Sequence, residues 1–258
     1  MPVKPKSRIR VTVMLGNSLT DRDTLAALEL LGPDPAAEVL GLFIEDSELL
    51  SLADIPVVRE YCRLTQAGRP LRVDELERQF RVQARRAERD LAEMVNPRGC
   101  PWSFRALRGD PVDLLRQTLA EVDLMLLGAT AGLPPGMVRR QAAAKRPVMA
   151  IFNRSEPAAR ALSVALRIAE SSGASLVVVL ASDSPQEMDA LREQAGGIVG
   201  ERAVDYLELS SDSIATTLEG LRRHPAGQLV LGMPAEPLDD HTIALLRGRS
   251  NCTVILVR

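Results

Sequence analysis

The chain has 258 residues, which is enough for one large domain or two modest ones. Its formal net charge of −2 gives no reason to expect nucleic acid or an anionic membrane as a partner. No apolar run reaches the roughly 18 residues that a membrane span needs, and three widely separated cysteines predict neither a disulfide framework nor a zinc site. We therefore expect a cytoplasmic protein.

The first half of the sequence alternates short apolar runs with helical patterns. The apolar runs predict strands at Ile9–Leu15, Val39–Ile44, Trp102–Leu107 and Val122–Leu127. Helices are expected after a cap at Thr20 or Asp21, over Asp74–Met94, and after Asp110–Pro111, a good N-cap followed by a proline at the first helical position. The segment Glu45–Gly68 is predicted to be irregular or weakly helical.

The second half repeats this alternation. Strands are predicted at Val148–Phe152, Leu176–Leu180, Val204–Leu209, Gln228–Leu231 and Cys252–Val257. Helices are expected at Pro157–Ser171, from Ser184–Pro185 to the glycines at 196, 197 and 200, after a cap at Ser211 or Asp212, and at Thr242–Leu246.

Two segments of the chain, Arg108–Gly132 and Ser210–Pro234, are versions of one pattern: a cap, a helix, a buried strand and a glycine. Such alternation specifies a parallel sheet with helices on both faces. The sequence therefore predicts an α/β protein with two tandem flavodoxin-like or Rossmann-like doubly wound domains, at residues 8–145 and 146–258. The first half is longer, and its surplus is placed chiefly in Glu45–Gly68.

The order of several weak motifs, found twice, carries a family resemblance. The motifs are the strand ends VMLGNS and AIFNRS, the crossover RGDPVDLL, the strands DLMLLG and QLVLGM, and the closing CTVILV. In this order the sequence resembles the universal stress protein family in its tandem two-domain form. The resemblance implies a flavodoxin-like fold, frequent dimerisation, and either ATP binding or its loss, because the family contains both kinds of member.

The nucleotide motif of the ATP-binding members, Gly-x2-Gly-x9-Gly-Ser/Thr, is altered in both halves. In the first half, three residues instead of two separate Gly128 from Gly132. In the second half, Ala235 occupies the position of the motif's second glycine after Gly232. The family's first-strand aspartate is replaced by Gly16 and Asn153. No cofactor is certain, and ATP or another adenine nucleotide is the candidate. The candidate binding residues all lie in the first half: Gly16, Asn17, Ser18, Gly128, Thr130, Gly132 and Gly136.

Any nucleotide binding is expected in the first half alone. After Gly232, proline removes an amide donor and Glu236 would repel phosphate. Enzyme motifs are missing, and neither His224 nor His241 has a metal-binding neighbour at suitable spacing. We predict no catalytic or metal-binding residue and a non-catalytic stress-response or regulatory protein. The alternative is an ATP-binding universal stress protein that hydrolyses ATP slowly in its first domain.

Two features bear on assembly. Six apolar residues of the long segment are expected to bury against the first-half site or a second molecule: Leu49, Leu50, Leu52, Ile55, Val57 and Val58. The first half also lacks a fifth strand, so Val122–Leu127 should lie at an edge that needs a partner. The other half of the chain could cover it as an internal pseudo-dimer, or a second chain could do so. A homodimer of tandem chains is favoured, a further protein partner remains open, and no nucleic acid or membrane is expected.

Overall fold

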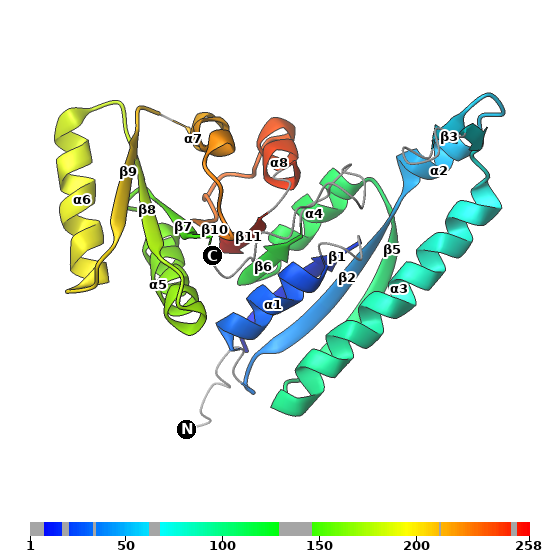
Figure 1. The fold of residues 1–258 in the computed structure, drawn as a ribbon, viewed down its shortest axis with the longest axis horizontal. Helices are drawn as coiled ribbons and strands as arrows, with labels where there is room; N and C mark the ends of the chain where they lie inside the picture. Colours follow the sequence, from blue (N-terminus) through cyan, green and yellow to red (C-terminus); the bar gives the residue numbers. More distant parts are fainter. Residues whose placement is uncertain are drawn as a thin grey trace, which may run out of the picture.

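The computed structural model of the chain describes residues 8–16, 21–32, 35–61, 68–128, 146–211, 213–248 and 252–258 (Figure 1). The first half comprises β1 (Arg10–Leu15), α1 (Asp21–Leu31), β2 (Glu38–Asp46), α2 (Ser47–Ala53), β3 (Arg59–Tyr61), β4 (Gly68–Pro70), α3 (Val73–Val95), β5 (Trp102–Gly109), α4 (Pro111–Leu119) and β6 (Leu124–Leu127). The second comprises β7 (Val148–Phe152), α5 (Glu156–Ser172), β8 (Leu176–Ala181), α6 (Pro185–Val199), β9 (Asp205–Leu209), α7 (Ile214–Gly220), β10 (Gln228–Gly232), α8 (Asp240–Arg247) and β11 (Thr253–Val257). Short 3₁₀ turns follow α3 and α7, at Asn96–Arg98 and Leu221–Arg223.

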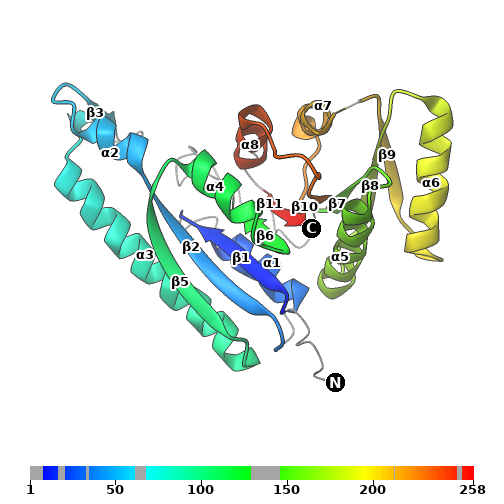
Figure 2. The ribbon, with the colours of Figure 1, turned by 180° about the vertical axis from the view of Figure 1, so that it is seen from behind.

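Nine strands form one continuous sheet in the order β5-β2-β1-β6-β11-β10-β7-β8-β9, and β3 and β4 form a separate hairpin. Within each half all neighbouring strands of the sheet run parallel. The predicted α/β fold with a parallel sheet is therefore confirmed. The strands of the first half fill one end of the sheet, and those of the second half fill the other (Figure 2).

The two halves meet at the one antiparallel pair of this sheet, β6 with β11. Leu126 lies opposite Ile255, and Leu124 lies opposite Val257. The edge strand predicted for the first half is thus covered by the fifth strand of the second half. This confirms the alternative in which the other half of the same chain covers the edge, and β6 needs no second chain as a partner.

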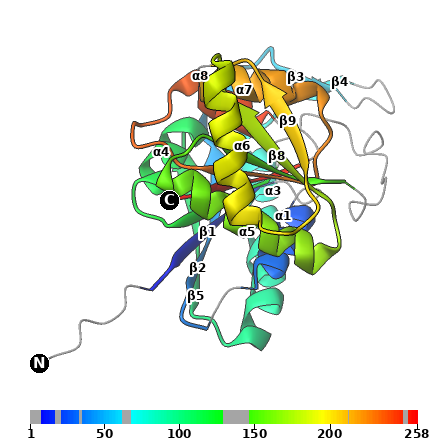
Figure 3. The ribbon, with the colours of Figure 1, turned by 90° about the vertical axis from the view of Figure 1, so that its left-hand side faces the viewer.

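Side chains on the two faces of the sheet enter two separate cores. The first core lies under α1, α3, α5 and α6, and it receives Leu124 and Leu126 of β6. The second lies under α4, α7 and α8, and it receives Met125 and Leu127. This alternation follows from the two-residue period of a strand. Figure 3, which views the molecule from the β9 side, shows α6 covering this end of the sheet.

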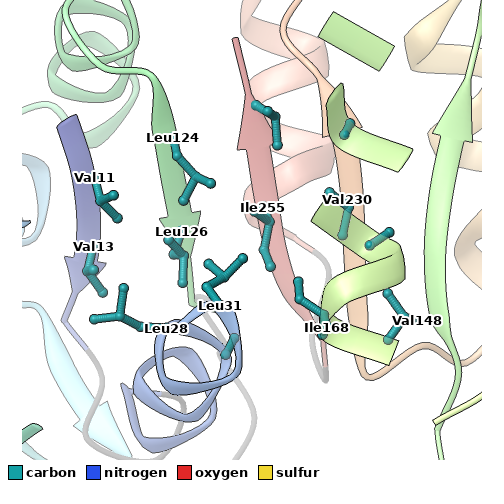
Figure 4. Close-up of a cluster of buried hydrophobic side chains, with 14 of the residues drawn as sticks. Val11, Val13, Leu28, Leu31, Leu124, Leu126, Val148, Ile168, Val230 and Ile255 are labelled. Atoms are coloured by element: carbon teal, nitrogen blue, oxygen red, sulfur yellow. The ribbon is translucent and has the colours of Figure 1, made fainter. Parts of the chain in front are cut away.

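The first core runs across the junction between the halves. Leu31 of α1 lies on the side toward Ile168 of α5, whereas Leu28 points toward Val13 of β1 (Figure 4), and the two helices pack together. The Nη2 group of Arg167 donates a hydrogen bond of 2.5 Å to the backbone carbonyl of Leu31. Helix packing therefore reinforces the strand pairing between the halves.

Helix caps agree with the sequence in some places and correct it in others. Asp110 Oδ1 accepts hydrogen bonds from the backbone of Val112 and Asp113, at 2.8 and 2.9 Å, as predicted. The cap of α7 is Ser213, whose hydroxyl accepts from Thr216 N at 3.1 Å, so the prediction of Ser211 or Asp212 is wrong. Ser211 instead uses its hydroxyl to bond the carbonyl of Ser213.

The glycines at 196 and 197 do not close α6, which continues to Val199 before Gly200 caps it. A glycine inside a helix costs about 1 kcal/mol relative to alanine. Ala195 and Val199 are buried on either side of the two glycines, and this packing holds the last turn in place. Tertiary burial therefore outweighs local propensity here.

The long segment of the first half is more ordered than the sequence predicts. Asp46 Oδ1 caps α2 by accepting hydrogen bonds from Glu48 N and Leu49 N, at 2.9 and 3.2 Å. The hairpin β3-β4 follows and leads into α3. We call residues 47–61 with 68–70 the arm, because they project beyond the sheet at the start of α3 (Figure 1).

Candidate functional site

Parallel α/β sheets bind ligands outside the carboxyl ends of their strands. Because β6 and β11 are antiparallel, the two halves present these ends on opposite sides of the sheet. Gly16 and Gly128 follow β1 and β6 on one side. Asn153 and Gly232 occupy the corresponding positions of β7 and β10 on the other. The chain therefore has two candidate edges that face away from each other.

The first-half edge brings together two of the predicted binding residues. Met14 lies opposite Leu127, so Gly16 and Gly128 follow neighbouring strand ends. The backbone N–H of Gly16 donates to Asp21 Oδ1 at 3.0 Å, and Asp21 is buried at the start of α1. Among the described atoms, a Cβ added at Gly16 would meet nothing within 4 Å.

The other predicted binding residues of this edge are Asn17, Ser18, Thr130, Gly132 and Gly136. They lie outside the described residues, so their roles stay predictions.

The second-half edge contains a cleft of about 780 Å³. One wall is the segment 232–238, and a second is formed by Asn153, Ser155 and Pro157 before and within the start of α5. Arg116, Leu119 and Ala120 contribute a third wall from the first half. This cleft consequently lies between the halves, which the sequence did not indicate.

Gly232 serves packing at this edge. A Cβ added there would lie 2.4 Å from the backbone nitrogen of Ala158 and 2.5 Å from the carbonyl carbon of Pro157. Real Cβ atoms essentially never approach other atoms so closely. Only glycine lets the first turn of α5 sit against the end of β10. The close helix approach alone therefore accounts for a glycine here.

The polar groups beside Gly232 are engaged within the turn before α5. Asn153 Oδ1 accepts hydrogen bonds from the hydroxyl and the N–H of Ser155, at 2.8 and 3.3 Å. The Ser155 hydroxyl also accepts from Ala158 N at 3.2 Å and caps the helix. Arg154 between them has a φ of 64°, a left-handed conformation that costs a non-glycine residue about 1 kcal/mol or more.

Charges around this cleft are of both signs. Arg116 pairs with Asp113 at 3.0 Å and also with Asp240 at the start of α8. Asp239 caps α8, and hydrogen bonds from the side chain and backbone of Thr242 lower the pKa of Asp239. Glu236 lines the cleft itself. An anion entering this edge would therefore meet Glu236 as well as Arg116 and Arg258.

Both histidines line one cleft of about 690 Å³ in the described part of the chain, together with Cys252. His224 caps the 3₁₀ turn after α7, and His241 Nε2 lies 3.3 Å from Glu219 on the neighbouring helix. No group of three or more His, Cys, Asp or Glu side chains that could hold a metal ion occurs among the described residues. None of the described helices has the length and apolar character required to cross a membrane.

Comparison with known proteins gives matches among solved structures. No protein-family model and no curated protein matches the sequence. A universal stress protein from Archaeoglobus fulgidus is 13% identical, with 96% of each chain covered and a TM-score of 0.47. The cytoplasmic domain of a prokaryotic cation chloride cotransporter is 12% identical, with 96% of this chain and 95% of that chain covered and a TM-score of 0.48. A protein of the universal stress protein family from Burkholderia pseudomallei is 23% identical over 44% of this chain and 96% of that chain, with a TM-score of 0.32.

This chain is similar to universal stress proteins.

Sequence reasoning missed three residues at the two edges. Asp21 was interpreted only as a helix cap, although its carboxylate is buried and bonds Gly16. Arg116 and Arg258 both reach the second-half cleft, the first from α4 and the second from beyond β11. Their positions follow from the β6–β11 pairing, so no local motif could have identified them.

Proposed function

We propose that the chain is a non-catalytic regulatory protein of the stress-response kind that acts by binding another protein chain through its arm. One observation carries the proposal. Of the eight large apolar side chains exposed among the described residues, five lie on the arm: Leu49 (37% exposed), Leu52 (47%), Ile55 (44%), Val57 (83%) and Tyr61 (70%). Clustered exposed apolar side chains mark interaction surfaces.

The exposure corrects part of the sequence prediction. Of the six apolar residues expected to be buried, only Leu50 is buried, and Val58 is half-buried. The prediction that these side chains are buried against the first-half site is therefore wrong. Contact with a second molecule stays a prediction, and it would cover the remaining side chains.

The base of the arm is fixed while its tip is exposed. Leu50 and Ala53 join the core beside α3. Arg108 of β5 pairs with Glu45 at 3.0 Å and with Glu77 of α3 at 2.9 Å. These hydrogen bonds, the one to Glu45 first, raise the pKa of Arg108. A surface held in place before binding loses little conformational entropy when a partner docks.

We expect the partner to be a second copy of the chain, and light scattering at micromolar concentration tests this. The wild-type chain should be a dimer. The double variant Leu52→Glu, Val57→Glu should raise the dimer dissociation constant by more than about tenfold, because it places charges in an apolar contact. Both side chains are exposed, so the free energy of unfolding should change by less than about 0.5 kcal/mol per substitution.

The matched control for the arm is Val82→Glu. Val82 is an exposed apolar residue of α3 outside the arm, with 62% of its surface accessible. This variant should remain dimeric. A monomeric wild-type chain, or a dimer that the double variant leaves unchanged, would contradict the proposed assembly.

A second candidate function is nucleotide binding at the first-half edge. It is favoured at Gly16, where an added Cβ would meet no described atom within 4 Å, in contrast to Gly232, where α5 already fills the space. Gly16 and Gly128 follow neighbouring strands there, and glycine lets backbone N–H groups approach a phosphate closely. Separated halves are not suitable for testing this, because their separation would expose β6 and β11 to solvent. The full chain contains both edges and serves for the test.

Calorimetric titration of the full chain with ATP tests the second candidate. If nucleotide binds, Gly16→Val should weaken it by more than about tenfold, since the added side chain fills the open space beside the strand ends. Ala235→Val, at the second-half edge, should leave the affinity unchanged. No detectable heat with the wild-type chain would remove this candidate without affecting the arm.

A further inference from the structure

A second cleft lies at the junction of the halves, on the face of the sheet opposite α4. It has a volume of about 790 Å³, within the range typical of small-molecule sites. It opens between the end of α1, the side of α5 and the ends of β1, β6 and β11. It shares Arg258 with the second-half cleft but lies on the other face of the sheet, away from the arm.

The walls of this junction cleft are mainly apolar. Leu28 and Leu31 come from α1, Val164 from α5, and Val11, Leu124 and Val257 from the three strands. Figure 4 shows Leu31 and Leu124 directed toward the space between the halves. Transfer of an apolar group from water to these apolar walls is favourable, so the cleft should prefer an apolar ligand group.

The rim of the junction cleft carries guanidinium groups on α5. Arg160 and Arg167 are seven residues apart, so they lie two turns apart on one helix face with Ser163 between them. Arg160 Nε donates to the carbonyl of Arg258 at 2.6 Å, and Arg167 Nη2 donates to the carbonyl of Leu31. Both groups are thereby held at the opening before any ligand arrives.

The positive charge of Arg167 at the rim is not neutralised by a carboxylate of the described residues. Asp123 is a lining carboxylate, and its Oδ2 already accepts the backbone N–H of Arg10 at 2.8 Å. Glu156 pairs with Arg160. Within the described part of the chain, Arg167 forms no ion pair. A guanidinium has five N–H donors, and the bond to Leu31 uses one.

We propose that the junction cleft binds a carboxylate with an apolar tail. The tail lies between α1 and α5, and the carboxylate meets Arg167 at the rim. A planar guanidinium matches a carboxylate with two parallel hydrogen bonds, which favours this head group. The ligand would touch both halves, and this function is independent of the arm and of nucleotide.

Calorimetric titration of the full chain with octanoate, below its micelle concentration, tests the proposal. Octanoate should bind at one site per chain. Acetate, which lacks the tail, and octanol, which lacks the charge, should each bind at least about tenfold more weakly. Octanol binding as tightly as octanoate would overturn the role of the carboxylate, and acetate binding equally well would overturn the role of the walls.

Two variants locate the site. Arg167→Met should weaken octanoate binding by about tenfold or more, because it removes the charged donor. Ser163→Glu should do the same by repulsion while keeping the bond from Arg167 to Leu31. Arg202→Met is the matched control, since Arg202 is exposed, pairs with Glu170 and does not line the cleft. Absence of octanoate binding, or binding that neither variant weakens, would overturn the proposal.

Discussion

Replacing Leu126 or Ile255 with alanine should lower the free energy of unfolding of the whole chain by about 2–5 kcal/mol. Both side chains are fully buried, and they lie opposite each other across the β6–β11 pair. Each substitution removes apolar contacts and leaves a cavity where the halves meet. Because one sheet and one core run through this junction, the loss should affect both halves together.

Urea unfolding measured with two probes checks the shared transition. Trp102 is the single tryptophan and lies on β5 of the first half, so its fluorescence reports on that half. Far-ultraviolet circular dichroism reports on the whole chain. Ile255→Ala, although it lies in the second half, should shift both transitions equally. A fluorescence transition that stays in place while the dichroism transition moves would mean that the halves unfold separately.

Gly232→Ala should destabilise the chain by about 3 kcal/mol. The added Cβ would collide with backbone atoms of Pro157 and Ala158, and backbone in a helix turn cannot rotate aside as a side chain can. The end of β10 and the start of α5 would have to move apart. Thermal or urea unfolding measures the loss.

Gly16→Ala is the matched control for this substitution. It occupies the corresponding strand end of the first half, where the added methyl group meets no described atom within 4 Å. Its effect on the free energy of unfolding should stay within about 0.5 kcal/mol. If Gly232→Ala proved equally mild, close packing could not be the reason for glycine at 232.

Most strands and helices could be predicted because local signals and burial agree. The pair Asp110–Pro111 places the start of α4, and the apolar run before Gly128 places β6. For the strand that pairs with β6, the sequence left two alternatives: a strand of the other half of the chain or a strand of a second chain. An apolar edge strand shows that a partner is needed, but its sequence does not say whether the same chain supplies it.

The candidate sites show the same limit. Gly16 and Gly128 follow neighbouring strands because β1 and β6 are parallel neighbours, whereas Arg116 reaches the second-half cleft only through the junction. For the arm, the sequence predicted burial and the structure shows exposure. Apolar composition indicates that a segment needs covering, but it does not identify the surface that covers it. Gly232 matched the start of a phosphate motif, and the structure shows a helix packed against it.

The antiparallel junction also determines how the fold would respond to mechanical force. Val11 and Val257 lie on either side of Leu124, so the start of β1 and the end of β11 emerge at the same edge of the sheet. Two strand spacings, roughly 10 Å, separate them. Tension applied between these points would pull across the strands and open their hydrogen bonds one after another. The fold would therefore unzip under load at the seam between its halves, where a shear geometry would have resisted with all bonds at once.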